Sequence, residues 1–585
     1  MKILIITIPL ISAIAILIIG RKIGTKGGEI ISKTSIIISG IISIIALKEN
    51  IEGEIKAIEI KEWFKIERLI GKMEIIYDKE TIIMINLISI VTLCVIYYSY
   101  WYLKEEAHIN RFISLLLIFS VTMYILVASK NYIFSFLGWE GVGIISFLLI
   151  NYWSNSIENS KSALKAVIFN KVGDIFYILA MVMMNNLDYY SNLSSKFSSF
   201  LLLFLLLAAM AKSAQIFFQC WLGDAMAGPT PVSALLHAAT MVTAGIFIII
   251  RSKILLYNEG FINYNNIIII IGSLTILFAL GIYQPYNSSL YNLLTHGFFK
   301  ALLFLAAGLL IHSFLFEQDL RKFGNFLFKS PLFYLFFLIG TLAIIAFPTM
   351  SGFYSKELIL LHSLTESYYY YILLLLGSFL SSLYSFKILY FSFFKNNSYP
   401  SLSSFHSLSG SISFLYPISF LIFGSIFLGY LSFDYFASPE YLNLSFESSL
   451  NSSSIFLKSF SILLPLLALL LLSFSSSLSP FNLFFKSFFP ILSLKFFFDN
   501  FYNYFIVRFF FLFSYHLSFK SLDRGFLEYL GPVSFFRLFF FFPKNYNLYN
   551  QSYSNSSFLF FYFFLSLLLL LLSFFFFLPF PLSLV

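Results

Sequence analysis

Nine ionisable side chains lie inside or beside long apolar runs of this sequence. They are Glu140, Lys171, Asp174, Lys212, His237, His296, Lys300, Lys356 and Glu357. A charge at the centre of a membrane span costs about 2.5–3.5 kcal/mol on insertion scales, so such residues usually face the protein interior and act there. Carboxylate, lysine and histidine groups on separate helices, joined by water, can pass protons to one another. The set therefore predicts a proton path across a membrane.

Glu140 lies among glycines in "FLGWEGVG", and Lys212 follows the apolar run "FLLLFLLLAAMA" two candidate spans later. Small residues allow a second helix to approach closely, so the carboxylate can reach a partner instead of lipid. We expect Glu140 to pair with Lys212, and opening of that pair would weaken the hold of the lysine on its proton. The alternatives are a static ion pair and a lysine that snorkels at a helix end.

His296 and Lys300 are four residues apart in "THGFFKALLFLAAG", so they share a helix face and form a candidate relay. His237 is a single histidine in the apolar stretch "SALLHAATMV", where a core histidine bonded to backbone is the simpler interpretation. Lys171 and Asp174 are three residues apart in "FNKVGDIFYIL" and could form either a structural ion pair or part of the path.

Lys356 and Glu357 follow a predicted interruption of the apolar segment 331–364, which contains Pro348 and Gly352. This segment is too long for one straight span, so we expect a broken helix. A break leaves backbone groups free to hold water or charge inside the membrane. The alternative is that the two charges simply start a helix at the membrane interface.

The elements that position these residues follow from composition. Of 585 residues, 59% are hydrophobic and 11% are charged, which indicates an all-α polytopic membrane protein of about 15–16 transmembrane helices. The net charge of +9 is attributed to loops rather than to nucleic-acid binding. The two cysteines have no metal-type spacing, and no redox motif is present, so we expect no cofactor in this chain. The candidate spans are 1–20, 29–47, 80–103, 110–129, 131–153, 163–186, 197–222, 231–251, 264–283, 288–312, 331–364, 369–395, 410–433, 455–476 and 556–584.

Two other segments differ from the spans. Segment 48–80 alternates Lys and Glu and predicts a solvated loop or short hairpin. Segment 481–550 combines aromatic residues with recurring charges and predicts a lateral amphipathic helix along the membrane surface. The expected organisation is N-terminal helices at 1–105, two helical segments at 106–255 and 256–395, further helices at 396–480, the lateral helix at 481–550 and a last membrane span at 551–585.

Several motifs occur in the order seen in chain 5 of NADH–ubiquinone oxidoreductase, respiratory complex I, which this sequence resembles. They are "FLGWEGVGIISFLLINYW", "KSALKAVIFNKVGD", "WLGDAMAGPTPVSALLHAATMVTAG", "THGFFKALLFLAAGLLIHS", "EQDLRKFG" and "GFYSKELI". The resemblance implies two inverted antiporter-like repeats, each with a broken helix. It also implies that Glu140 and Lys212 are the coupling pair and that His237, His296 and Lys300 lie on a central hydrophilic axis. Lys356 and Glu357 would lie at the outer end of that axis.

The resemblance further implies proton translocation coupled to NADH oxidation and ubiquinone reduction, with NADH, FMN, iron–sulfur clusters and ubiquinone all held by partner subunits. The chain would thus be part of an enzyme without a redox centre of its own. Expected partners are other membrane-arm subunits, especially a neighbouring antiporter-like one, and lipids, in the mitochondrial inner membrane or a bacterial plasma membrane. The alternatives are a subunit of a multi-subunit sodium/proton antiporter and a structural scaffold whose channel has decayed.

Three departures from the family pattern bear on the path. Phe217 stands where the family usually has the proline that breaks the helix after the coupling lysine, and Asn292 stands where it usually has a histidine. Near 281–291 the sequence is shorter than expected, by about 20 residues or one crossing. Without the proline, the break after Lys212 must arise differently or be milder. The relay position at Asn292 does not titrate near neutral pH, because an amide replaces the imidazole.

Overall fold

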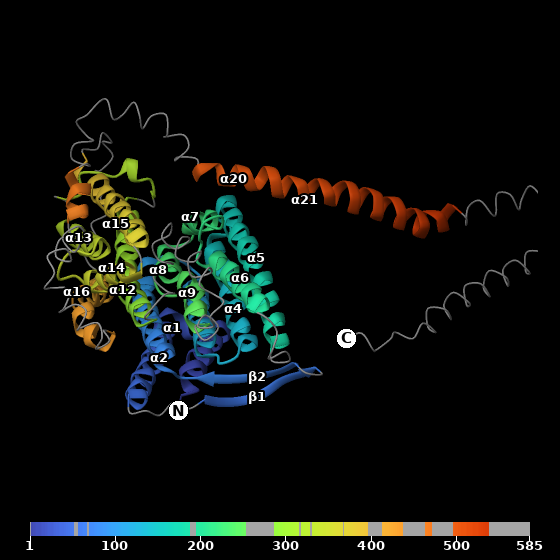
Figure 1. Cartoon of the computed structure of the whole chain (residues 1–585). Helices are drawn as coiled ribbons and strands as arrows, with labels where there is room; N and C mark the ends of the chain where they lie inside the picture. The colour runs from blue at the N-terminus through green and yellow to red at the C-terminus, as the bar shows by residue number, and fades with distance from the viewer. Residues whose placement is uncertain are drawn as a thin grey trace, which may run out of the picture. The chain divides into compact units, whose positions relative to one another are not determined.

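The computed structural model describes residues 2–51, 57–66, 69–187, 195–252, 286–314, 317–327, 330–366, 368–395, 412–436, 463–470 and 495–537. The main helices of the first compact unit (residues 1–489) are α1 (Leu4–Ile51), α2 (Lys79–Tyr102), α3 (Ile109–Ala128), α4 (Tyr132–Ile150), α5 (Ile157–Leu187), α6 (Ser195–Lys212), α7 (Cys220–Asp224), α8 (Thr230–Ala238), α9 (Met241–Arg251), α12 (Tyr286–Ser313), α13 (Pro331–Ile345), α14 (Ser351–Glu366), α15 (Tyr368–Leu389) and α16 (Leu415–Phe436). Together they form a helical bundle (Figure 1).

Within the described ranges, ten helices are long and apolar enough to cross a membrane, and α6 and α13 are shorter apolar helices. A helix satisfies its own backbone hydrogen bonds, which lipid cannot do, so this architecture fits the predicted class. The predicted spans at 264–283 and 556–584 lie outside the described residues, as does most of 455–476. The predicted shortening near 281–291 also lies partly outside them, and its last residues belong to the start of α12.

The first two predicted spans are joined directly, without a loop. Gly24 has φ +73 and kinks α1, a conformation that glycine adopts without a Cβ penalty. The Asn110 side chain of α3 donates to the carbonyls of Gly20 at 2.8 Å and Gly24 at 3.1 Å. The kink therefore bends one long helix into two segments that pack on α3.

The Lys/Glu-rich segment forms an antiparallel hairpin of β1 (Ala57–Ile66) and β2 (Leu69–Ile76), the second of the two predicted forms. Buried Glu74 of β2 pairs with Lys130 at 3.0 Å and so attaches the hairpin to the loop between α3 and α4. Figure 1 shows the hairpin at the end of the bundle where α2 begins, and we call this the hairpin end.

The predicted break in segment 331–364 is confirmed. Helix α13 ends at Ile345 and α14 begins at Ser351, with left-handed backbone at Ala346 (φ 67) and Thr349 (φ 79) between them. A Cβ on Gly352 would lie 2.0 Å from the Ala343 carbonyl oxygen, so only glycine fits where the two helix ends meet.

The chain also breaks immediately after Lys212, although the expected proline is absent. Ala214 (φ 52) and Phe217 (φ 72) adopt left-handed conformations, and α7 begins only at Cys220. Proline is fixed near φ −65°, so a proline could not reproduce the conformation of Phe217. The Trp221 indole donates to the Ala211 carbonyl at 3.0 Å and so satisfies one of the backbone carbonyls at the end of α6. The break therefore arises from left-handed backbone at Ala214 and Phe217 instead of from a proline.

The second compact unit, residues 490–585, contains a long helical stretch at 498–537 that includes α20 (Phe498–Phe501) and α21 (Arg508–Phe513). Apart from a few partly covered residues, its side chains are exposed within the single chain. A helix inside 481–550 is thus present, and its location along the membrane surface stays a prediction. The predicted anchor at 551–585 lies outside the described residues.

Candidate functional site in the membrane

Four charged residues of the first predicted repeat form a continuous series of alternating sign, which we call the charge chain. Glu140 is on α4, Lys171 and Asp174 are on α5, and Lys212 is the last residue of α6. Nearest charged atoms are 2.5 Å apart for Glu140–Lys171, 3.5 Å for Lys171–Asp174 and 3.9 Å for Asp174–Lys212. The chain runs from the partly exposed Glu140 to Lys212, whose side chain is 0% exposed.

The expected direct pair between Glu140 and Lys212 is not formed in this structure. Glu140 bonds instead to Lys171, whose side chain is 50% exposed, and Asp174 is the carboxylate nearest to Lys212. The physical reason is helix rotation, because adjacent residues on a helix point about 100° apart. Trp139, not Glu140, faces Lys212, and its carbonyl accepts from the Lys212 ammonium at 3.1 Å. The interpretation of Lys171 and Asp174 as a pair is confirmed.

Trp139 is a functional candidate that the sequence analysis missed. Its indole Nε1 donates to Asp174 at 2.7 Å, and its ring centroid lies 5.1 Å from the Lys212 ammonium. The ring is fully buried, so it holds both partners of the Asp174–Lys212 pair in place. Gly143 leaves room for the lysine, since a Cβ there would lie 3.0 Å from its ammonium. The available signal was the "GWEGVG" motif, in which Trp139 directly precedes Glu140.

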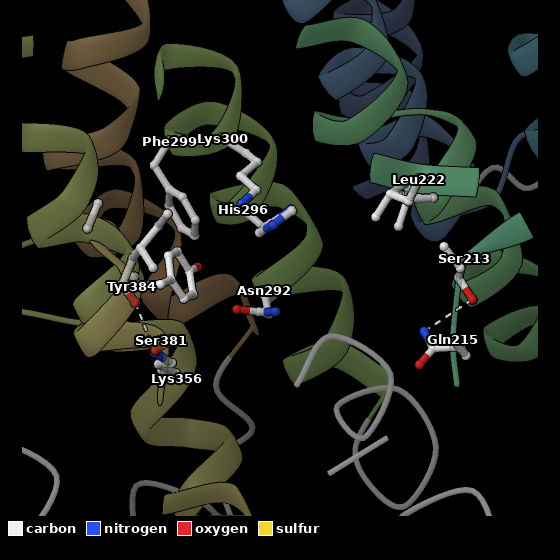
Figure 2. Close-up of a pocket in the computed structure, with 15 residues that line it drawn as sticks. Ser213, Gln215, Leu222, Asn292, His296, Phe299, Lys300, Lys356, Ser381 and Tyr384 are labelled. Carbon is white, nitrogen blue, oxygen red and sulfur yellow. Dashed lines mark hydrogen bonds between the residues drawn. The ribbon is translucent and has the colours of Figure 1, made fainter. Parts of the chain in front are cut away.

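A cavity of about 290 Å³ is lined by the candidate residues His296, Lys300 and Lys356. It is bounded by the break after Lys212, by α12, by the break between α13 and α14, and by α15. The lining residues are Ser213, Ala214, Gln215, Leu222, Val242, Asn292, His296, Phe299, Lys300, Ala343, Ile344, Gly352, Lys356, Ser381 and Tyr384. Figure 2 shows His296 and Lys300 on one face of α12, with Ser213 and Gln215 across from them. The cavity therefore adjoins the end of the charge chain and contains the predicted relay pair.

Asn292 takes part in a hydrogen-bonded group at this cavity. Its side-chain oxygen accepts from the Ser355 hydroxyl at 3.2 Å, and the Thr295 hydroxyl donates to Ser355 at 3.0 Å. An amide both donates and accepts, so Asn292 can orient water without changing its charge. Ser355 and Thr295 were not predicted, because hydroxyl residues are common in membrane helices and carry no distinctive spacing.

Lys356 lies at the break between α13 and α14, as predicted. Its ammonium donates to the Ile344 carbonyl at 2.9 Å and to the Ser381 hydroxyl at 3.3 Å (Figure 2). The first bond satisfies a carbonyl at the end of α13, so this lysine is held by backbone rather than by a carboxylate. Glu357 is the next residue of α14, partly buried, and does not line the cavity.

His237 lies in the last turn of α8, where the helix breaks before α9 begins at Met241. Its ring is buried and tilted against Phe304, with ring centroids 5.5 Å apart, while the Lys300 ammonium lies 5.9 Å from the same Phe304 ring. Neither ring nitrogen of His237 has a hydrogen-bond partner among the described residues. Within the described residues, therefore, His237 is not the backbone-bonded core histidine of the simpler interpretation.

Comparison with known proteins gives matches over nearly the whole chain. A family model described as NADH:quinone oxidoreductase/Mrp antiporter, TM, matches residues 129–284 and 278–383. Models described as NADH-Ubiquinone oxidoreductase (complex I), chain 5 N-terminus, and NADH dehydrogenase subunit 5 C-terminus match residues 63–113 and 384–574. NADH-ubiquinone oxidoreductase chain 5 of Chondrus crispus is 35% identical over 92% of this chain and 91% of its own length.

The chain belongs to the NADH-ubiquinone oxidoreductase chain 5 family. The Metridium senile member is 37% identical over 74% of this chain and 78% of its own length. Among solved structures, the Mrp complex of Dietzia sp. DQ12-45-1b matches with a TM-score of 0.68 at 18% identity, covering 80% of this chain and 56% of that chain. The membrane-bound sulfane sulfur reductase matches with a TM-score of 0.62 at 17% identity. These two likenesses establish an antiporter-like fold.

Proposed function

We propose that this chain is a core membrane subunit of respiratory complex I that translocates protons, while NADH oxidation and ubiquinone reduction take place in other subunits. The observation that carries the proposal is the cavity bounded by both helix breaks. It begins beside Lys212, at Ser213 and Gln215, and contains His296, Lys300 and Lys356. Titratable groups gathered at one cavity inside an apolar bundle are what proton transfer requires.

The proposed mechanism starts at the charge chain. When the Glu140–Lys171 pair opens, Lys171 is free to interact more strongly with Asp174, which it already contacts at 3.5 Å. Two cations then compete for one carboxylate, and the charged form of Lys212 loses part of its stabilisation. Lys212 would release its proton toward the cavity, and closing the Glu140–Lys171 pair would restore the original state. In this relayed switch, Glu140 acts on Lys212 through Lys171 and Asp174 rather than by direct contact.

Inside the cavity, Lys300 is the proposed central carrier. No carboxylate lies within ion-pair distance of Lys300 among the described residues, so nothing there fixes its charge. His296, one turn earlier on α12, and Lys356, across the cavity, are the neighbouring carriers. Water in the cavity would connect these groups, and Glu357 would lie beyond Lys356 at the outer end of the path.

The proposed partner is a neighbouring antiporter-like subunit on the exposed face of α5. Ile168, Ile175 and Ile178 are exposed there, and Lys171 is half-exposed among them. An apolar face must be covered by lipid or protein, and a covering subunit could also act on the Glu140–Lys171 pair. We place the assembly in the mitochondrial inner membrane, an inference supported by the 77 phenylalanines among 585 residues, because such an excess fits a nucleotide-biased gene of an organellar genome.

The test is proton translocation per NADH oxidised, measured after reconstituting the native assembly in vesicles. Lys300→Met removes the carrier while keeping an unbranched side chain, and we expect a lower ratio with the assembly still present. Lys387→Met, on an exposed position of α15, is the matched control and is expected to keep the wild-type ratio. An unchanged ratio in Lys300→Met would overturn the proton-carrier role.

The second candidate, a sodium/proton antiporter subunit, is favoured only by the fold of the Mrp complex. The match of residues 384–574 to the NADH dehydrogenase subunit 5 C-terminus favours the complex I assignment. Purification of the native assembly distinguishes the two, because an antiporter would co-purify with no NADH-oxidising partner.

A further inference from the structure

We propose that Tyr177 is a positioning residue for proton release at Lys212, because its ring stack fixes the rotation of α4 that places Trp139 against Lys212. The inference rests on the proposed role of the charge chain in proton translocation. Tyr177 is fully buried on α5, three residues after Asp174 and therefore on the same face of that helix. It thus lies beside the charge chain without being a member of it.

The Tyr177 ring stacks on two rings of α4. Its centroid lies 5.1 Å from that of Trp139 at an interplanar angle of 26°, and 5.7 Å from that of Phe136 at 24°. Stacking of this kind is a preferred arrangement of aromatic rings in a protein interior. Because Phe136 and Trp139 are three residues apart, they lie on one face of α4, and the stack holds that face against α5.

The Tyr177 hydroxyl attaches the same side chain to the first turn of α4. The Ser135 hydroxyl donates to the Tyr132 carbonyl at 2.8 Å, so its oxygen is left to accept from the Tyr177 hydroxyl at 2.5 Å. The Tyr177 hydroxyl also lies 3.5 Å from the Tyr132 carbonyl. One side chain of α5 therefore contacts α4 from Tyr132 to Trp139, over roughly two turns of the helix.

Helix α4 packs on α3 through glycines instead. A Cβ on Gly138 would lie 2.5 Å from the Leu126 backbone nitrogen, and one on Gly141 would lie 2.7 Å from the Thr122 side chain. Glycine lets two helices approach closely, but it has no side chain that could interlock with a neighbour and oppose rotation of α4 about its axis. The aromatic face held by Tyr177 is therefore the interlocking contact of α4 beside the charge chain.

The rotation of α4 matters because Trp139 contacts both members of the Asp174–Lys212 pair. Its indole donates to Asp174 at 2.7 Å, and its carbonyl accepts from the Lys212 ammonium at 3.1 Å. Adjacent helix residues point about 100° apart, so rotation of α4 would exchange Trp139 for Glu140 at Lys212. The stack thus keeps the Asp174–Lys212 pair in place while the Glu140–Lys171 pair opens.

The test replaces Tyr177 in the native assembly, with assembly level, NADH oxidation and protons translocated per NADH measured after reconstitution in vesicles. Tyr177→Leu removes the ring, and we expect a lower proton ratio. Tyr177→Phe keeps the stack and should retain much of the ratio, because a cavity of about 20 Å³ beside Ser135 and Tyr177 has room for a water that replaces the lost hydroxyl. An equal loss in both variants would contradict the ring stack as its cause.

Phe176→Leu is the matched control on the same helix. The Phe176 ring stacks on Phe204 of α6, with centroids 6.2 Å apart, away from the charge chain. We expect this variant to lose a ring contact between two helices and still to keep the wild-type proton ratio. A loss in Phe176→Leu equal to that in Tyr177→Leu would overturn the specific role of Tyr177.

A double variant separates positioning from a merely structural role. If Tyr177 acts through Asp174, then Tyr177→Leu combined with Asp174→Asn should lose no more of the proton ratio than Asp174→Asn alone, because substitutions that share one partner are not additive. A structural effect would add to the loss caused by Asp174→Asn, and that result would overturn the proposal.

A second ring variant covers the case in which Tyr177→Leu lowers the assembly level. Phe136→Leu removes the other ring of the stack and leaves Tyr177 in place, so we expect a smaller loss of the proton ratio. A wild-type ratio in the ring variant that assembles overturns the positioning role. The two proposals fail differently: a wild-type ratio in Asp174→Asn refutes the charge chain itself, whereas a loss there with a wild-type ratio in the ring variant refutes only the role of Tyr177.

Discussion

Replacing Asp174 by Asn tests the relayed switch most directly. Asp174 is the carboxylate nearest to Lys212, at 3.9 Å, and the lysine side chain is fully buried. For unit charges at the 3.9 Å separation and an effective dielectric constant of about 20, Coulomb's law gives roughly 4 kcal/mol. At about 1.4 kcal/mol per tenfold change, this is roughly three orders of magnitude in the ratio of charged to neutral Lys212.

The substitution isolates the charge from the local packing. An asparagine oxygen can still accept the Trp139 indole hydrogen bond that Asp174 accepts at 2.7 Å, so the arrangement of α4 and α5 is retained. We expect Asp174→Asn to assemble normally and to translocate fewer protons per NADH, because Lys212 no longer retains a proton to release. The assay is vesicle acidification measured alongside NADH oxidation in the reconstituted assembly.

Two controls sharpen this prediction. Asp174→Glu keeps the carboxylate and is expected to retain much of the ratio. Asp224→Asn removes a carboxylate that pairs with Lys165 at 2.6 Å outside the charge chain, and is expected to leave the ratio unchanged. A wild-type proton ratio in Asp174→Asn, at wild-type assembly level, would refute the reasoning that Asp174 sets the charge of Lys212.

Substitutions at three further positions test the helix breaks and the cavity. Phe217→Gly should raise the stability of the assembly by about 1–2 kcal/mol, because Phe217 has φ 72 and glycine adopts that conformation without strain. Phe217→Pro should lower the stability, because proline cannot adopt it. The amount of intact assembly that remains after heating distinguishes these outcomes. Gly352→Ala should destabilise by about 1–3 kcal/mol or more through contact with the Ala343 carbonyl, and a normal heat tolerance would contradict the close approach. Asn292→Leu removes the acceptor of the Ser355 hydroxyl and should lower the proton ratio, while Asn292→His should preserve it.

Much of the fold could be read from the sequence, because in lipid the backbone has few choices. Apolar runs of sufficient length must become helices, and Pro348 with Gly352 indicated where one of them breaks. The break after Lys212 could not be located by the same rule. It depends on left-handed backbone at Ala214 and Phe217, residue types that carry no signal for that conformation.

The sequence by itself identified the candidate residues, since a charge inside an apolar run is costly enough to mark its position. It predicted the Lys171–Asp174 contact, because residues three apart on one helix must be neighbours. Only the tertiary structure decided which groups meet across helices. Whether Glu140 or Trp139 faces Lys212 depends on how α4 is rotated about its axis, and a shift of one residue changes that direction by about 100°. The packing of α2 and α8 on α12 likewise brings Tyr98 and Thr230 against Gly308, a meeting of three helices that no local pattern contains.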